Sequence, residues 1–207
     1  SIVGTRLSRV LSPRMIVRIG QVSLVVSAVI LLGSATSDLR SVFFATGMFL
    51  AGAALGLLAS QLGNVNMSSV TEKETSEVGG LQGVFQNLGS SLGTALIGSI
   101  LIGALSTSFA SGVASSALPD ATKTTVASAT QQGVAIVPAA DVAAIAEKAG
   151  LSDADADSLA TIYRDSQLSS LRIAFFALIL ISLLSLFFSK GIPRTNDAHL
   201  RRTPTTG

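Results

Sequence analysis

The stretch Gly79–Leu105, GGLQGVFQNLGSSLGTALIGSILIGAL, decides what kind of protein this chain forms. It contains no charged residue, yet it holds seven glycines, two glutamines and one asparagine. Glycine costs a water-exposed helix roughly 1 kcal/mol relative to alanine, and side-chain amides are unfavourable in an apolar environment without hydrogen-bond partners. A segment that combines both residue types predicts a membrane helix with one face turned away from lipid.

Charged residues are absent from four blocks of the chain, at positions 19–37, 41–71, 78–119 and 173–189. Only 13% of all residues are charged, against roughly 25% in an average soluble domain. About 20 helical residues cross the hydrocarbon core of a bilayer, and all four blocks reach or approach that length. A soluble bundle would carry charged outer faces with i,i+4 pairs. We therefore expect an all-α integral membrane protein that is embedded in the lipid bilayer.

The expected organisation comprises a basic loop, four membrane spans, a long outer loop and a basic tail. The segments are a cytoplasmic loop at 1–15, transmembrane helices at about 16–34, 42–63 and 78–105, an extracytoplasmic loop at 106–169, the last transmembrane helix at 170–189 and a cytoplasmic tail at 190–207. The first half of the outer loop is rich in Ala, Ser and Thr and is expected to be irregular. Its second half predicts two short helices, with Asp141 and Ser152 as N-caps and Gly150 as a stop. The second of these helices leads into the last span.

The distribution of Lys and Arg predicts the orientation. Nine of the fourteen lie before or at the start of the first span, between the second and third spans, or after the last span. Short cytoplasmic loops of membrane proteins carry an excess of these residues. We therefore expect a multi-pass protein of the cell membrane with both termini in the cytoplasm. Because the positive charges flank the apolar blocks instead of forming one patch with aromatic residues, nucleic acid is not an expected partner.

Residue types that carry out chemistry are scarce in this chain. There is no cysteine, and the single histidine is His199 in the polar tail. We therefore expect no enzyme activity, no metal site and no cofactor. Proton-coupled pumps need an ionisable group inside the membrane, and none of the four spans has one near its middle. Glu77 and Arg172 lie at span ends, where anchoring at the membrane interface is expected.

A helical wheel sorts the third span into two faces. The bulky side chains gather on one face, which suits lipid. The opposite face consists of small and amide-bearing residues, namely Gly79, Gln82, Gly83, Gln86, Asn87, Ser90, Gly93 and Thr94. Small residues allow membrane helices to approach closely. The glycines whose spacing fits such contact are Gly79, Gly83, Gly89 and Gly93 in this span, and Gly52 and Gly56 in the second span.

The amides of this face have two interpretations. As structural groups, Gln82, Gln86 and Asn87 would bond to neighbouring helices, which contributes about 0.6 kcal/mol each. As functional groups, they would line a water-filled pathway and offer neutral donors and acceptors to a solute. Gln61 and Asn64, at the cytoplasmic end of the second span, fit either role. From the residues alone, both interpretations stay open.

The third span also carries a resemblance to a known family. Its sequence SEVGGLQGVFQNLGSSLGTALIGSIL, at 76–101, resembles the penultimate span of the fourteen-span drug:proton antiporters of the major facilitator superfamily. The opening GTRLSRVLSPRMIVRIG looks like the cytoplasmic loop motif of that superfamily, which Leu7, Pro13 and Arg14 fit. The resemblance covers the chain as the last four spans of such a transporter. It implies a major-facilitator-type C-terminal bundle, and it favours the amide face as part of a substrate cavity between two halves.

Two functions are therefore carried forward. The resemblance implies the C-terminal part of a proton-coupled multidrug efflux transporter, with a small amphipathic or cationic solute and protons as partners. The missing N-terminal half would supply the acidic coupling residues, and the fragment alone would not be competent for transport. The alternative is a non-transporting four-span membrane protein, acting as an assembly partner or as an anchor for its outer loop.

Overall fold

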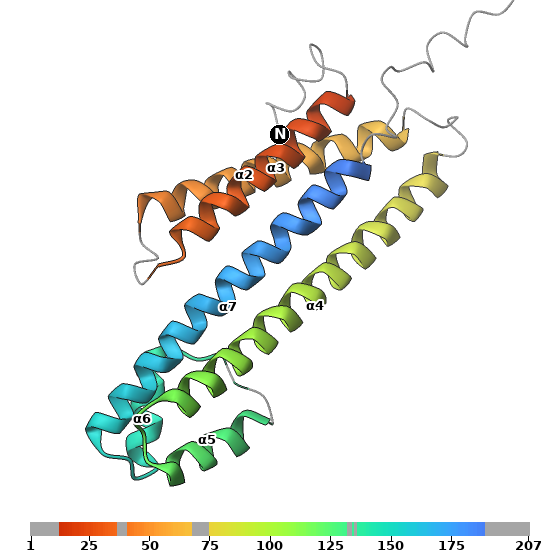
Figure 1. Cartoon of the computed structure of the whole chain (residues 1–207). Coiled ribbons are helices and arrows are strands. Elements are labelled where there is room, and N and C mark those ends of the chain that lie inside the picture. The colour runs from red at the N-terminus through yellow and green to blue at the C-terminus, as the bar shows by residue number, and fades with distance from the viewer. Residues whose placement is uncertain (1–12, 37–40, 68–74, 132–133, 135, 189–207) are drawn as a thin grey trace, which may run out of the picture. The chain divides into compact units, whose positions relative to one another are not determined.

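The computed structural model of the chain describes residues 13–36, 41–67, 75–131, 134 and 136–188. These residues form six helices and no strand (Figure 1). In chain order the helices are α2 (Pro13–Ser34), α3 (Val42–Met67), α4 (Thr75–Ser115), α5 (Asp120–Gln131), α6 (Ala139–Lys148) and α7 (Asp153–Phe188). Of these, α2, α3, α4 and α7 are long and apolar enough to cross a membrane. The prediction of an all-helical fold with four long apolar helices is therefore confirmed.

Two of the long helices extend well beyond a single membrane crossing. Helix α4 has 41 residues and α7 has 36. At the rise of an α-helix these lengths correspond to about 62 Å and 54 Å, whereas the hydrocarbon core is about 30 Å thick. Helix α4 continues to Ser115, past the predicted end at Leu105, and α7 runs without a break from Asp153 into the last span. A bilayer can therefore enclose only part of each helix.

The region that follows the third span is helical, and the prediction of irregular chain there was wrong. The end of α4 and the whole of α5 occupy it. Its many hydroxyl groups bond back to carbonyl oxygens of their own helix, as Thr124 does to Asp120 at 2.9 Å and Ser128 to Thr124 at 2.9 Å. Such bonds satisfy the hydroxyl group within the helix. A composition rich in Ser and Thr is therefore compatible with the helix at these positions.

The helix ends around α6 agree in part with the sequence predictions. Gly150 has a φ of 90°, the left-handed conformation in which glycine commonly ends a helix. The Ser152 hydroxyl accepts the backbone N–H of Asp155 at 3.3 Å and caps α7 as predicted. The predicted N-cap at Asp141 was wrong. Helix α6 follows Pro138 with no side-chain cap, and Asp141 lies in its first turn, where a negative charge favours the helix dipole.

The chain divides into two compact units. The first unit contains α2, α3, the part of α4 up to Gly93 and the part of α7 from Leu178 onward. The second unit contains α4 from Thr94, the short helices α5 and α6, and α7 up to Ala177. Both α4 and α7 therefore contribute to both units.

In the first unit, α2 and α3 pack closely at Gly47. The Ser27 hydroxyl, which is buried, donates to the Gly47 carbonyl oxygen at 2.8 Å. A Cβ atom added at Gly47 would lie 2.9 Å from two side-chain carbons of Leu31. A second close approach occurs at Gly20, where a Cβ atom would lie 2.9 Å from Cγ of Leu58. Close contact of this kind supplies the van der Waals attraction that holds membrane helices together.

Replacement of Gly47 by alanine should weaken the α2–α3 contact. The added methyl group forces Leu31 or the helix backbone to shift, and overpacking of this kind costs about 1–3 kcal/mol. The measurement is the thermal unfolding midpoint of the chain reconstituted in lipid nanodiscs. Gly52→Ala is the matched control, because a Cβ atom at Gly52 meets nothing within 4 Å. Equal midpoints for the two variants would contradict this account of the contact.

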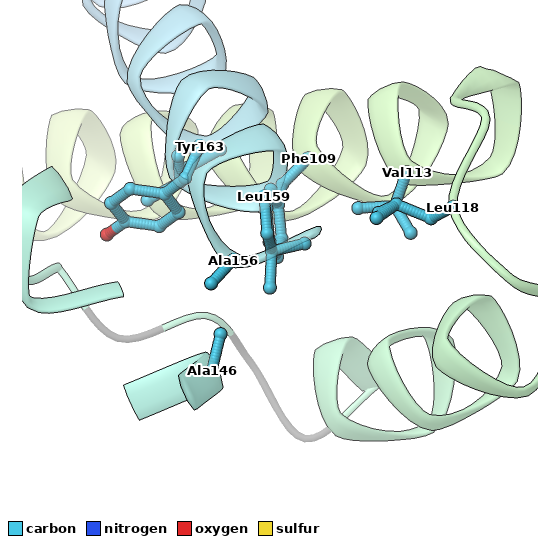
Figure 2. Close-up of a cluster of buried hydrophobic side chains, with 8 residues drawn as sticks. Phe109, Val113, Leu118, Ala146, Ala156, Leu159 and Tyr163 are labelled. Carbon is cyan, nitrogen blue, oxygen red and sulfur yellow. The ribbon is translucent and has the colours of Figure 1, made fainter. Parts of the chain in front are cut away.

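The second unit is organised around one cluster of buried apolar side chains, most of which appear in Figure 2. Its members are Leu105, Phe109, Val113, Leu118, Ala146, Ala156, Leu159 and Tyr163. The rings of Phe109 and Tyr163 meet edge to face, with centroids 5.4 Å apart and planes at 87°. Nearby, a Cβ atom at Gly112 would lie 2.6 Å from Cγ2 of Ile162. In this unit α4 and α7 are therefore in direct contact.

Two side chains of α7 hold the non-helical segment that precedes α6. The hydroxyl oxygen of Tyr163, a residue only 2% exposed, accepts the backbone N–H of Val137 at 3.1 Å. The Gln167 amide donates from Nε2 to the Val137 carbonyl oxygen at 2.9 Å. Both backbone groups of Val137 are thus paired, which allows a segment outside regular secondary structure to pack against the unit.

Tyr163→Phe should release this segment without emptying the core. The variant keeps the ring that packs on Phe109 but loses the acceptor for the Val137 N–H, which costs about 1 kcal/mol. Hydrogen exchange at the Val137 amide should therefore become faster. Thr161→Val, on an exposed position of the same helix, serves as the control and should leave the exchange rate unchanged. An unaltered rate in Tyr163→Phe would rule out this hydrogen bond.

Candidate functional site

The polar face of α4 predicted from the sequence is uncovered in the described part of the chain. Gln86, Asn87 and Ser90 are exposed, and Gln82 is half-buried. None of these four side chains has a hydrogen-bond partner among the described residues. The hydroxyl of the next residue, Ser91, differs from them because it bonds to the Asn87 carbonyl oxygen of its own helix. The amide groups of α4 therefore remain available to another helix or to water.

The opposite face of α4 is also exposed, but its chemistry is different. Its bulky side chains include Leu81, Val84, Phe85, Leu88, Leu92 and Leu96. Lipid tails are as apolar as these side chains, so the bulky face needs no protein cover. Transfer of an amide from water into hydrocarbon without a hydrogen-bond partner costs about 4–8 kcal/mol of free energy. The amide face therefore requires a polar neighbour, whereas the bulky face does not.

The glycines predicted to mediate helix packing are not at contacts between described helices. A Cβ atom would meet nothing within 4 Å at any of Gly52, Gly56, Gly79, Gly83, Gly89 and Gly93. The α2–α3 contact instead uses Gly20 and Gly47. Sequence reasoning missed these two because neither has a glycine four residues away. Packing of the other six glycines against a further helix stays a prediction.

Several predicted site residues fall partly or wholly outside the described residues. Gln61 and Asn64 belong to helix α3, but their side chains are outside the described set. The same holds for the side chain of Arg14, and Leu7 lies entirely outside it. Pro13 is the first residue of α2, a position at which proline is favoured because its missing N–H would have no helical partner. The roles predicted for these residues stay predictions.

The sequence analysis expected two ionisable residues, Glu77 and Arg172, to anchor span ends at the membrane interface. The side chain of Glu77 lies outside the described residues, whereas Arg172 donates from Nε to the Ala35 carbonyl oxygen at 3.0 Å. Among the residues that the structure describes, no group of three His, Cys, Asp or Glu side chains could hold a metal ion. The described side chains of the amide face itself, Gln82, Gln86, Asn87 and Ser90, are neutral hydrogen-bond donors and acceptors.

A polar group that the sequence analysis did not single out lies inside the first unit. Gln21 of α2 is 9% exposed, and its Nε2 donates to the hydroxyl oxygen of Ser185 in α7 at 2.9 Å. Its Oε1 is buried and has no partner among the described residues. The available signal was that Gln21 is the only side-chain amide between positions 16 and 34. A lone amide within an apolar span indicates a buried polar contact.

The Gln21–Ser185 contact should respond differently to removal of either partner. Ser185→Ala leaves both Nε2 and Oε1 of Gln21 without a partner. We expect the free energy of unfolding to fall by about 0.6–1.7 kcal/mol, the range for hydrogen bonds between membrane helices. Gln21→Leu removes the amide together with its unpaired oxygen, so it should be neutral or stabilising. Thermal unfolding midpoints in nanodiscs measure both effects. A larger loss for Gln21→Leu than for Ser185→Ala would show that Oε1 has a partner.

Comparison with known proteins does not assign the chain to a family. No family of known proteins, no curated protein and no solved structure matches it. The resemblance to the fourteen-span drug:proton antiporters therefore stays a prediction that depends on the residues at 4–20 and 76–101.

Proposed function

We propose that the chain supplies the last four membrane helices of a proton-coupled, multidrug-type efflux transporter of the major facilitator kind. In this proposal the amide face of α4 lines or supports the cavity that a small amphipathic or cationic solute crosses. The partner is an N-terminal half that carries the acidic coupling residues. Both termini lie in the cytoplasm, and the loop at 106–169 lies on the extracytoplasmic side of the cell membrane.

The observation that carries the proposal is the uncovered amide face of α4. Gln86, Asn87 and Ser90 lie in a helix that is apolar enough to span a membrane, and their side chains have no partner among the described residues. Neutral amides in a water-filled pathway can exchange hydrogen bonds with a solute without the cost of burying a charge. The resemblance of the same stretch to an antiporter span supports the same assignment.

A second function is favoured by a separate observation. The second unit has its own buried cluster and its own hydrogen bonds to Val137, as a small soluble domain has. Such a unit fits a non-transporting protein that anchors this helical module at the membrane or assembles with a partner through the glycine faces. In that case the amide face of α4 would be covered by another helix and not by water.

Cysteine accessibility distinguishes the two environments of α4. The chain has no cysteine of its own, so a single introduced thiol is the only reactive site. Ser90 and Leu92 are at nearly the same depth, about 3 Å apart along the helix axis, but on opposite faces. We expect Ser90→Cys in the membrane-embedded protein to react with a charged, water-soluble thiosulfonate and Leu92→Cys to remain unreactive.

The opposite result would count against the cavity. If Ser90→Cys stays unreactive and forms an interchain disulfide on mild oxidation, the face is a packing surface between copies and the transporter role of α4 is wrong. Reaction of both variants at equal rates would also contradict a sorted helix. Solvent-exposed Ser128→Cys in α5 provides the reference for full reactivity.

Transport itself is tested with the native gene product. An antibody against the second unit should detect a membrane protein of more than twice the 21.0 kDa of this chain. Cells that lack the gene should accumulate a lipophilic cationic dye, and a protonophore should abolish the difference between these cells and the wild type. A product near the mass of this chain, together with unchanged dye accumulation, would rule out a self-sufficient exporter and favour the anchoring function.

A further inference from the structure

A cavity of about 570 Å³ lies in the second unit and opens to its surface, because lining residues such as Ala121, Thr125 and Ile145 are exposed. Its walls come from α5, α6 and the packed parts of α4 and α7, and they include Phe109, Leu159 and Tyr163 of the buried cluster. Figure 2 shows these three side chains together with Ala146 of α6, which also lines the cavity. Small-molecule sites in proteins commonly enclose about 300–1,000 Å³. The cavity therefore has the size of a ligand site and not of a packing defect.

The lining of the cavity is uncharged. It contains no Lys, Arg, His, Asp or Glu, and its polar groups are threonine hydroxyls, the tyrosine hydroxyl and backbone. The hydroxyls of Thr125 and Thr130 donate to carbonyl oxygens of their own helix, to Ala121 at 3.0 Å and to Ala127 at 2.9 Å. An ionised ligand would have no counter-charge here.

We propose that this cavity binds an uncharged apolar group of small-molecule size, carried either by a free neutral solute or by a lipid acyl chain. The absence of charge in the lining disfavours ionised ligands, and two of its three threonine hydroxyls already donate within their own helix. Every lining residue belongs to the second unit, and none lies on the amide face of α4. The inference therefore does not depend on the proposed transport function and survives if that function is wrong.

The chain contains its own reporter for this cavity. Tyr163 is its only tyrosine, and it has no tryptophan, so the intrinsic fluorescence of the protein comes from the cavity wall. We would titrate the full 207-residue chain in phosphatidylcholine vesicles, which contain no other protein, with bromobenzene, a neutral heavy-atom quencher. We expect quenching that saturates. The anion 4-bromobenzoate should quench only weakly and without saturation, because the lining cannot stabilise its charge.

Two variants on α6 provide a matched pair. Ala146 is 4% exposed and lines the cavity, whereas Ala144 on the same helix is exposed and does not. Ala146→Phe fills the cavity and should abolish the saturable quenching, and Ala144→Phe should retain it. Far-ultraviolet circular dichroism checks that both variants fold. If Ala146→Phe does not fold, Ala121→Phe, at an exposed lining position of α5, replaces it.

The outcomes distinguish a lipid acyl chain from a free solute, and they include results that would contradict the proposal. Vesicles made with brominated acyl chains should quench Tyr163 if a lipid chain enters the cavity, and Ala146→Phe should remove that quenching. Saturation with bromobenzene alone would assign the site to a free solute. Linear quenching by bromobenzene that is equal in wild type, Ala146→Phe and Ala144→Phe, or equal saturable quenching by 4-bromobenzoate, would overturn the proposal.

Discussion

The hydrocarbon core of a bilayer offers no hydrogen-bond partner, and the four long apolar helices of this protein meet that constraint. Every backbone polar group at membrane depth must be paired within the segment itself, which only a helix or a closed barrel achieves. Side-chain hydroxyls satisfy the same condition locally, as Thr46 does by donating to the Val42 carbonyl oxygen at 2.7 Å. Serine and threonine therefore add little free-energy cost to these apolar helices and carry little information about function.

Side-chain amides cannot be satisfied in the same way, and they mark the places where the spans need a neighbour. Gln21 reaches Ser185 across two helices, while Gln86 and Asn87 remain uncovered in the described chain. The difference is one of position. Gln21 faces the interior of the first unit, and the α4 amides face outward. In a helix that is apolar enough to cross a membrane, an outward amide face requires water or a further protein surface, which is why the proposed function depends on this helix.

The second unit has a compact apolar core of its own. Its core combines aromatic and aliphatic side chains, the Phe109–Tyr163 pair among them, and its charged residues stay at the surface, as the exposed Asp120 beside Lys123 illustrates. The non-helical segment at Val137 is held by two side chains of α7. The same elements leave an uncharged cavity, because the short helices α5 and α6 do not fill the space beside the long pair. Small side chains such as Ala121 and Ala146 on these helices leave that space open.

The sequence by itself determined the helical class, the number of apolar helices and most of their limits, because charge-free blocks and hydrophobic length act locally. It also predicted the stop at Gly150 and the cap at Ser152, which depend on neighbouring residues. It failed at 106–131, where composition indicated irregular chain but local hydroxyl bonds are compatible with helix. Only the tertiary structure decided which residues meet: the glycine contacts at Gly20 and Gly47, the Gln21–Ser185 bond and the cavity beside Tyr163. These features join positions far apart in the chain, and no local pattern of residue types encodes such distances.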